Sequence, residues 1–459
     1  MNEAKIAETL NRVVPDREFP AGVLAGARRR LHRNRTLGAA AAVALVAAIT
    51  IPLGMVLGGT GRQGVRAAED LHGQTALQNL PLEDTPHIAE AATASSRIAW
   101  EAMITDKEVQ TLNKAIAPSS LAVTLAMLAE GATGPSKTSL DEAFGLSGDD
   151  RSAAMGALRQ ALKDYEDLPT SVDADDPPTT PVVHQANRVV ILDDANIQQE
   201  FLDRLASYYD TGAKRIPSEG AKADLDAWAL EHTAGLIKKS AVEITPDLRL
   251  VTQDALLFAA RWQQEFSHDN LPLPFTTGDG TTATIDALGD TFSVAYASAE
   301  QWEAVRLPYN ETLAMDVILP TRGVHPSQLD FDAIHASVSA LEEADETSVD
   351  LTMPPSDIQT QWDLLEPLNN QGLNLSEMDG IFTDATIDKV AQQVRLTVTA
   401  KGTVGAAITE AEVVVESAPA PLDIKELTVD RPFIMRVLDT RTGWPLFIAI
   451  VNDPNNLPN

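Results

Sequence analysis

The feature that most constrains this chain is a long segment, Ala400–Pro421, that lies between sequences typical of β-strands. Apolar and polar residues alternate before it, at Val394–Val398, and apolar runs follow at Phe433–Val437 and Leu446–Val451. A connection of this length is uncommon in a compact domain and is usually either functional or disordered. The fold must therefore provide a place, or a use, for this segment.

The first half of the segment has a regular pattern with a period of two. One set of alternating positions is small or slender and carries no charge: Thr403, Gly405, Ala407, Thr409, Ala411 and Val413. The other set carries Glu410 and Glu412. A neutral, slender face with this period is what a strand needs to enter between other strands. The glycines of the first half, with Pro419 and Pro421, argue against a permanent strand. We therefore predict a loop that can also become a central strand.

Short motifs around this segment resemble the hinge and C-terminal signature of the serpins. They are Gly402-Thr403, Ala406-Ala407, Arg431-Pro432-Phe433 and Leu446-Phe447. Upstream, the resemblance includes the strand Asn187–Leu192, Trp228 with Thr233–Ile237, and Leu250–Phe258 leading to Trp262. It covers about residues 85–455 and depends on the order and spacing of the motifs together.

The resemblance implies an α+β serpin fold. This fold has a large central mixed sheet, called sheet A, with two further sheets, about eight or nine helices and an exposed reactive loop. The loop is expected at about residues 400–424 of a serpin domain that spans 81–459. Within that domain, the residue pattern predicts one helix over Leu225–Ile237. The resemblance also implies a helical region over Leu364–Gly380.

The resemblance also implies a function, suicide inhibition of an extracellular serine protease through a covalent acyl complex. In serpins the cut loop inserts into sheet A and releases stored strain. The hinge of that insertion is expected at Gly402, Thr403, Val404, Gly405, Ala406 and Ala407. The family spacing places the reactive bond between Glu416 and Ser417, and a shift of one or two residues stays open.

The residues before the expected cut favour two kinds of target protease. Glu416 suits a protease with a basic specificity pocket, whereas Val413, Val414 and Val415 suit an elastase-like pocket for small aliphatic side chains. Trypsin-like targets are disfavoured because the nearest basic residues, at 401 and 425, lie too far from the bond. The two target classes remain alternatives.

Three residues match the shutter, the region of the family where sheet A opens: Ser120, Asn187 and Gln392. The family often has a histidine where this chain has Gln392. Glutamine can donate and accept the same hydrogen bonds, but it does not titrate. We therefore expect no pH-dependent latch at this position. A second departure is Asp254, which stands where the family has asparagine.

The N-terminal region predicts a membrane anchor. Residues 36–61 carry no charge and are long enough to cross a hydrocarbon core of about 30 Å. Five arginines lie within residues 28–35, just before this stretch. This asymmetry places residues 1–35 in the cytoplasm and the rest outside, after a tether over residues 62–80. The expected location is thus the cell membrane, with a single span that contacts the lipid bilayer. A cleaved signal peptide is the alternative.

Composition excludes several functions. The chain has no cysteine, so it has no disulfide and no thiolate chemistry. The net charge is −31, and residues 63–459 hold 26 basic against 62 acidic residues, a net charge of −36. Such an acidic body is poorly suited to nucleic acid. Because residues 165–182 are acidic and proline-rich, we expect no heparin site there.

No pattern in the sequence predicts catalysis. The eight histidines show no metal-ligand spacing, and the motifs GxSxG and HExxH do not occur. We therefore expect no cofactor, no metal and no enzymatic activity. We also expect the chain to be a monomer. The alternative function is that of a non-inhibitory binding or scaffold domain with the serpin fold at the cell surface.

Overall fold

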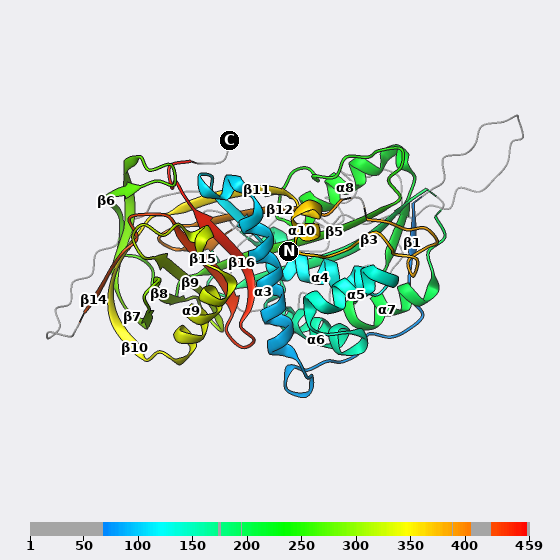
Figure 1. Cartoon of the computed structure of the whole chain (residues 1–459), viewed down its shortest axis with the longest axis horizontal. Coiled ribbons are helices and arrows are strands. Elements are labelled where there is room, and N and C mark those ends of the chain that lie inside the picture. Colours follow the sequence, from blue (N-terminus) through cyan, green and yellow to red (C-terminus); the bar gives the residue numbers. More distant parts are fainter. Residues whose placement is uncertain (1–67, 173–175, 194, 388, 405–423, 457–459) are drawn as a thin grey trace, which may run out of the picture. The chain divides into compact units, whose positions relative to one another are not determined.

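The computed structural model describes residues 68–172, 176–193, 195–387, 389–404 and 424–456. The chain divides into two units, Met1–Gln63 and Gly64–Asn459, and the described residues all belong to the second. This second unit has the expected α+β architecture, in which two sheets are packed with helices (Figure 1). The α-helices of the described residues are α3 (Ile88–Thr105), α4 (Pro118–Ala129), α5 (Gly134–Phe144), α6 (Gly148–Ala161), α7 (Gln199–Tyr209), α8 (Ser218–His232), α9 (Phe331–Glu343) and α10 (Leu365–Asn370).

Sheet A has seven strands among the described residues, in the order β1-β4-β3-β5-β13-β12-β11. It is mixed, since β3 and β4 are parallel and its other pairs are antiparallel. The strands are β1 (Glu69–Leu71), β3 (Val182–Leu192), β4 (Ala213–Ile216), β5 (Leu250–Arg261), β11 (Ser356–Asp363), β12 (Ala391–Val398) and β13 (Gly402–Val404).

The remaining strands form one hydrogen-bonded sheet of nine, called sheet B below, in place of the two further sheets expected. They are joined because β7 is long enough to pair with β6 along its first half, with β10 along its second half and with β8 at its end. The strands are β2 (Lys114–Ile116), β6 (His268–Thr276), β7 (Thr282–Ser298), β8 (Trp302–Pro308), β9 (Leu313–Pro320), β10 (Glu346–Met353), β14 (Lys425–Thr428), β15 (Phe433–Asp439) and β16 (Trp444–Val451).

The core lies between the sheets and around α3 and α4. Every residue of α4 is buried, and the helix packs against β5 of sheet A and β16 of sheet B. Pro118 opens α4 at a position where its missing N–H has no cost. In β15 and β16 all residues are buried, as the continuous apolar runs of the sequence predict for strands covered on both faces. Figure 1 shows α3 crossing beside β16.

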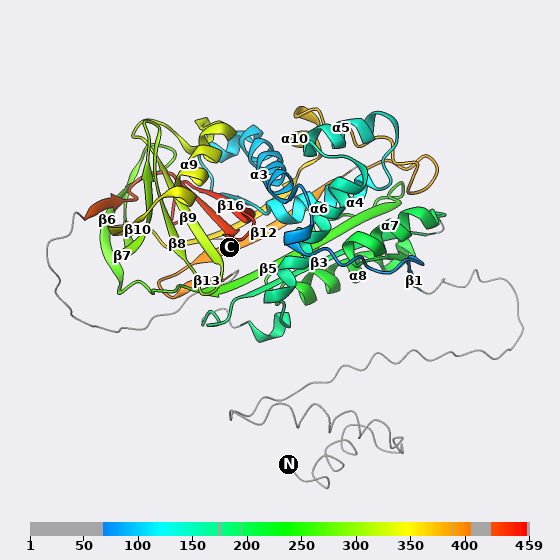
Figure 2. The ribbon, with the colours of Figure 1, turned by 90° about the horizontal axis from the view of Figure 1, so that it is seen from below.

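Neighbouring residues of β3 point to opposite faces of sheet A. Arg188 pairs with Asp224 of α8, and Asn187 accepts a hydrogen bond from Arg159 of α6. Since side chains alternate along a strand, α8 and α6 cover opposite faces of the sheet (Figure 2). The expected helix over Leu225–Ile237 begins earlier and ends at His232. The helix does not continue because the Ile237 N–H donates to the Thr233 side chain instead of to a helical carbonyl, and because Gly235 has a left-handed φ of 79°.

The sheet extends into the stretch expected to be a tether. Glu69–Leu71 pairs antiparallel with β4 and forms the edge of sheet A. Gly73 follows, and an added Cβ there would lie 2.4 Å from the Leu202 carbonyl oxygen of α7. The chain thus approaches α7 more closely than a side chain allows. The expected helical region over Leu364–Gly380 contains only the short helix α10.

Candidate functional site

The candidate site is the hinge, where the segment that opened the sequence analysis leaves β12. Its first three residues, Gly402–Val404, form β13 between β12 and β5. Thr403 lies opposite Val398 of β12 and Ala260 of β5, and its side chain is fully buried. The start of the loop is therefore already a strand of sheet A.

The turn from β12 to β13 is held by the end of β5 and the residues after it. The Trp262 N–H donates to the Lys401 carbonyl at 3.0 Å, and its indole N–H donates to the Thr399 carbonyl at 2.9 Å. The Phe266 N–H donates to the Ala400 carbonyl at 3.0 Å. These three bonds satisfy carbonyls that the strands leave unpaired, so the position of the turn is well determined.

Glycine is required at residue 402. A Cβ built there would lie 2.3 Å from the Ala260 carbonyl oxygen and 2.8 Å from the Arg261 Cα. Both contacts are with backbone, which cannot move aside as a flexible side chain can. A larger residue at 402 would therefore displace β13 from β5. The sequence identified this glycine by family resemblance, and the structure supplies the steric reason.

Tyr309 anchors the hinge from the core. Its hydroxyl donates to the Thr403 hydroxyl at 2.6 Å. Its ring stacks on Trp262, with centroids 4.3 Å apart, and meets Phe258 edge to face. Burial raises the pKa of Tyr309, so the phenol stays protonated and remains a donor. Nothing in the sequence indicated this role, since Tyr309 follows β8 in a turn remote from the loop.

We expect Tyr309→Phe to loosen the hinge. The change leaves the Thr403 hydroxyl buried without this donor, which costs about 1–3 kcal/mol. Urea unfolding measures that cost, and limited proteolysis after Lys401 reports release of β13. Tyr165→Phe is the matched control, because it also removes a tyrosine–threonine hydroxyl contact, to Thr312, away from the hinge. Equal proteolysis of both variants would contradict the assignment.

Beyond β13, sheet A has a gap between β5 and β12. In the described residues these two strands share no ladder, and β5 pairs with β3 while β12 pairs with β11 on their outer sides. A small cavity of about 40 Å³ lies there, lined by Thr252–Ala255 of β5, by Ala391 and Gln393 of β12, and by residues of α8. Facing strand edges with no partner between them are a template for another strand.

The expected shutter residues lie in two separate groups. The Gln392 side chain accepts from the Ala117 N–H at 2.9 Å and donates to the Ala117 carbonyl at 3.0 Å, so it fixes the chain just before α4. Ser120, in the first turn of that helix, is buried. Asn187 lies on β3, on the far side of β5, where its amide donates to Asp254 and accepts from Arg159 at 3.1 Å.

Asp254 is the buried acid of this group. Burial is the main cause that raises the pKa of its carboxyl to about 7, and the Asn187 amide and the Arg159 guanidinium oppose this effect. Its Oδ1 atom has no hydrogen-bond partner among the described residues. The sequence showed only that this acid departs from the family pattern, because its burial depends on how β3, β5 and α6 pack.

We expect Asp254 to make the protein less stable as the pH rises. A carboxyl whose pKa is raised on folding stabilises the folded state only while it is protonated. This stabilisation begins to disappear as the pH rises past the ordinary aspartate pKa of about 3.9. It is fully lost above the pKa of the folded state. Between pH 5 and pH 8 the melting temperature of wild type should therefore fall further than that of Asp254→Asn. Parallel pH profiles would contradict this assignment.

The other sequence-predicted residues lie outside the described part of the chain. They are the hinge residues Gly405, Ala406 and Ala407, the specificity residues Val413, Val414 and Val415, and the reactive bond at Glu416 and Ser417. The expected membrane span at 36–61 also lies outside it. In the part that the structure describes, no helix has the length and apolar character that crossing a bilayer requires.

Comparisons with known proteins agree with this geometry. A family model described as Serpin (serine protease inhibitor) matches residues 100–454. An uncharacterized serpin-like protein of Thermococcus kodakarensis is 25% identical over 364 residues, which cover 75% of this chain and 81% of the relative. Plasminogen activator inhibitor 1 of Neovison vison is 24% identical over 371 residues, which cover 74% and 87%.

A solved structure shows the same fold. The crystal structure of tengpin, a thermophilic serpin, in its native state superposes with a TM-score of 0.70 at 20% sequence identity. The match covers 84% of this chain and 99% of tengpin. The fold expected from the sequence motifs is therefore confirmed.

Proposed function

Because the chain belongs to the serpin family, we propose that it is a suicide-substrate inhibitor of serine proteases. It acts by cleavage of its reactive loop and insertion of that loop into sheet A. The observation that carries this proposal is the gap between β5 and β12, which β13 already enters from one end. The neutral, slender face of the loop sequence has the character that such a gap accepts.

The register of β13 predicts how far the loop enters. Gly402 lies opposite Arg261, and Val404 lies opposite Ala259. Continued in the same register, the loop would pair along all of β5 and reach Leu250 with Val413. Val413 is also where the uncharged set of alternating residues ends. The free edge of β5 and the insertable part of the loop thus have the same length.

The chemical step belongs to the protease. Its serine oxygen attacks the carbonyl carbon of Glu416, and the peptide bond to Ser417 breaks. The carbonyl of Glu416 becomes an ester of that serine, and the amine of Ser417 leaves with the proton. Insertion then carries the attached protease along the molecule before water hydrolyses the ester. The intact protein is accordingly a kinetically trapped state.

The target class is tested by incubation with an elastase and with a Glu-specific protease. We expect one of them to give a covalent complex that survives a denaturing gel. The mass of the released C-terminal peptide then locates the cut at Glu416 or at Val413–Val415. Cleavage by both enzymes with no complex would favour the alternative, a non-inhibitory binding or scaffold domain.

We also propose that residues 36–61 anchor the protein in the cell membrane and that residues 1–35 are cytoplasmic. The uncharged stretch and the preceding arginines support this arrangement. The serpin domain, which includes β1 at Glu69–Leu71, is then extracellular and monomeric. Membrane fractionation with external protease treatment tests this topology, because a cleaved signal peptide would release the domain in soluble form.

A further inference from the structure

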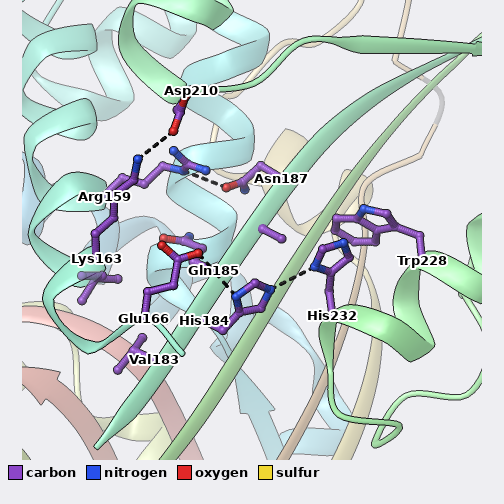
Figure 3. Close-up of a pocket in the computed structure, with 12 residues that line it drawn as sticks. Arg159, Lys163, Glu166, Val183, His184, Gln185, Asn187, Asp210, Trp228 and His232 are labelled. Carbon is purple, nitrogen blue, oxygen red and sulfur yellow. Dashed lines mark hydrogen bonds and ion pairs between the residues drawn. The ribbon is translucent and has the colours of Figure 1, made fainter. Parts of the chain in front are cut away.

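Two histidines join α8 to β3 on the face of sheet A that α8 covers. His184 of β3 and His232 at the end of α8 face each other, with His184 Nε2 at 2.9 Å from His232 Nδ1 (Figure 3). Their rings are parallel to within 2°, with centroids 5.2 Å apart. Trp228, one turn earlier on α8, packs against His232 at 4.5 Å between centroids. The two nitrogens thus share a hydrogen bond between secondary structure elements distant in sequence.

This bond requires one hydrogen between two nitrogens. A neutral pair has it, because one imidazole donates and the other accepts. A pair with one extra proton also has it, and Glu166 faces the remaining nitrogen of His184, with Oε1 at 3.7 Å from Nδ1. When both rings are protonated, both nitrogens are donors and the two cations repel. Two protons therefore break the contact, and one does not.

The surroundings keep the pair neutral. Burial is the main cause that lowers the pKa of His184, and burial followed by the charge of His184 lowers the pKa of His232. A cavity of about 290 Å³ adjoins the pair (Figure 3). The charged groups that face the pair are Glu166, Lys163 and Arg159 on one side, Asp210 beyond them, Arg188 on β3 and Glu231 on α8. Since acids and bases are both present, no single charge overrides the effect of burial.

The other attachments of α8 to the sheet do not titrate near neutral pH. Asp224 pairs with Arg188 at 2.7 Å and with Lys214 at 2.6 Å. Although burial opposes them, these partners lower the pKa of Asp224, so its carboxylate stays ionised. The Gln253 amide donates to the Leu225 carbonyl at 3.1 Å. Of these attachments, only the histidine pair takes up protons as the pH falls below the ordinary histidine value of about 6.5. Asp254 of β5, whose pKa is raised to about 7, borders the same cavity as Trp228 and Ala229, but it is hydrogen-bonded to Asn187 of β3 and does not attach α8 to the sheet.

We propose that the His184–His232 pair is a proton-sensitive clasp that holds α8 over the gap between β5 and β12. The residues of α8 that line that gap, Trp228 and Ala229, are within one turn of His232. The effect of the clasp on inhibition rests on the proposed function, in which the entering loop passes beneath α8. A closed clasp slows that passage, and an open clasp speeds it.

The direction of the pH effect follows from burial. Histidines whose pKa is lowered in the closed state bind protons more readily once α8 has moved away. The free energy that favours the closed state over the open one is therefore fully present above the ordinary histidine pKa of about 6.5. It decreases as the pH falls below that pKa. Acid therefore opens the clasp. For each proton taken up, the equilibrium constant for opening rises by about tenfold for each unit by which the pKa differs between the open and closed states.

The test is hydrogen exchange of the intact full-length protein at pH 7.5 and pH 5, corrected for the intrinsic exchange rates. We expect the amides of α8 to lose protection several-fold at pH 5 in wild type. His232→Asn places an amide near the position of Nδ1 and removes one of the two titrating rings, so the protection of α8 should change clearly less between the two pH values than in wild type. The matched control is His335→Asn on α9, an exposed histidine, which should behave as wild type.

Two results would overturn the clasp: unchanged α8 protection in wild type at pH 5, or the same loss in His232→Asn as in wild type. His232→Phe distinguishes loss of the clasp from loss of the fold. In this variant the α8 amides should have low protection at both pH values, while the amides of sheet B keep their protection. None of these measurements involves a protease, so they stand apart from the proposed function. If the clasp is real and the inhibitor function is also correct, complex formation should be faster at pH 5.5 than at pH 7.5 in wild type only.

Discussion

Thr403→Arg is expected to turn the proposed inhibitor into a substrate. Thr403 is fully buried between β5 and β12 and contacts the Tyr309 hydroxyl. An arginine there would displace β13 from the sheet of the intact protein. Insertion of the cut loop would then have to bury the arginine without a paired anion, and an unpaired buried charge costs several kcal/mol. A cost of about 3 kcal/mol slows insertion roughly 100-fold. The protease then hydrolyses its ester before it is displaced.

The measurement is the number of inhibitor molecules consumed for each protease molecule inactivated, together with the complex seen on a denaturing gel. We expect the number to rise at least about tenfold and the complex to fade, while the cleaved chain accumulates. Thr403→Ser is the matched control, because it keeps the hydroxyl and should inhibit as wild type does. Lys401→Arg controls for an added guanidinium outside the strand. Complex formation by Thr403→Arg at the wild-type level would count against insertion through this hinge.

Cleavage of the reactive loop is expected to raise the melting temperature by about 10 °C or more. An inserted strand would add roughly ten backbone hydrogen bonds along the free edges of β5 and β12, each worth about 1 kcal/mol net. A domain of this size gains about 1 °C in melting temperature for each kcal/mol. Calorimetry of the intact protein and of the protein clipped within residues 413–417 measures the difference.

The control for this experiment is again Thr403→Arg. Its clipped form should gain much less than clipped wild type, because the return of residue 403 to sheet A would bury the added charge. If clipped and intact wild type melt together, sheet A does not accept the loop, and the protein is then a binding or scaffold domain with the same fold. A gain in wild type that disappears in the variant assigns the stabilisation to the gap between β5 and β12.

Much of the fold was predictable because its signals are local. The apolar runs at 433–437 and 446–451 are buried strands, and Pro118 begins a buried helix, as their patterns indicate. The end of α8 was not predictable, because the side chain of Thr233 competes for backbone bonds where the periodicity continued. Continuity of sheet B also escaped prediction, since it depends on which strands share β7.

The candidate site divides in the same way. Gly402 and Thr403 were identified by their resemblance to the serpin hinge, and Gln392 was identified as a non-titrating residue at a position where the family often has histidine. Tyr309, which anchors Thr403, is separated from it by 94 residues, and no pattern in either segment connects them. His184 and His232 are likewise isolated in the sequence. Only the packing of α8 on β3 brings their nitrogens together.

The sequence by itself identified a long segment with a neutral, alternating face between buried strands, and it predicted a hinge that begins at a glycine. Alternation and residue size are properties of neighbouring residues, so they can be read without a fold. The tertiary structure alone decided that β5 and β12 leave an open edge among the described residues, that Asp254 is buried, and that His184 of β3 meets His232 of α8. These features depend on contacts between distant segments, whose distances and solvent exclusion are set by packing.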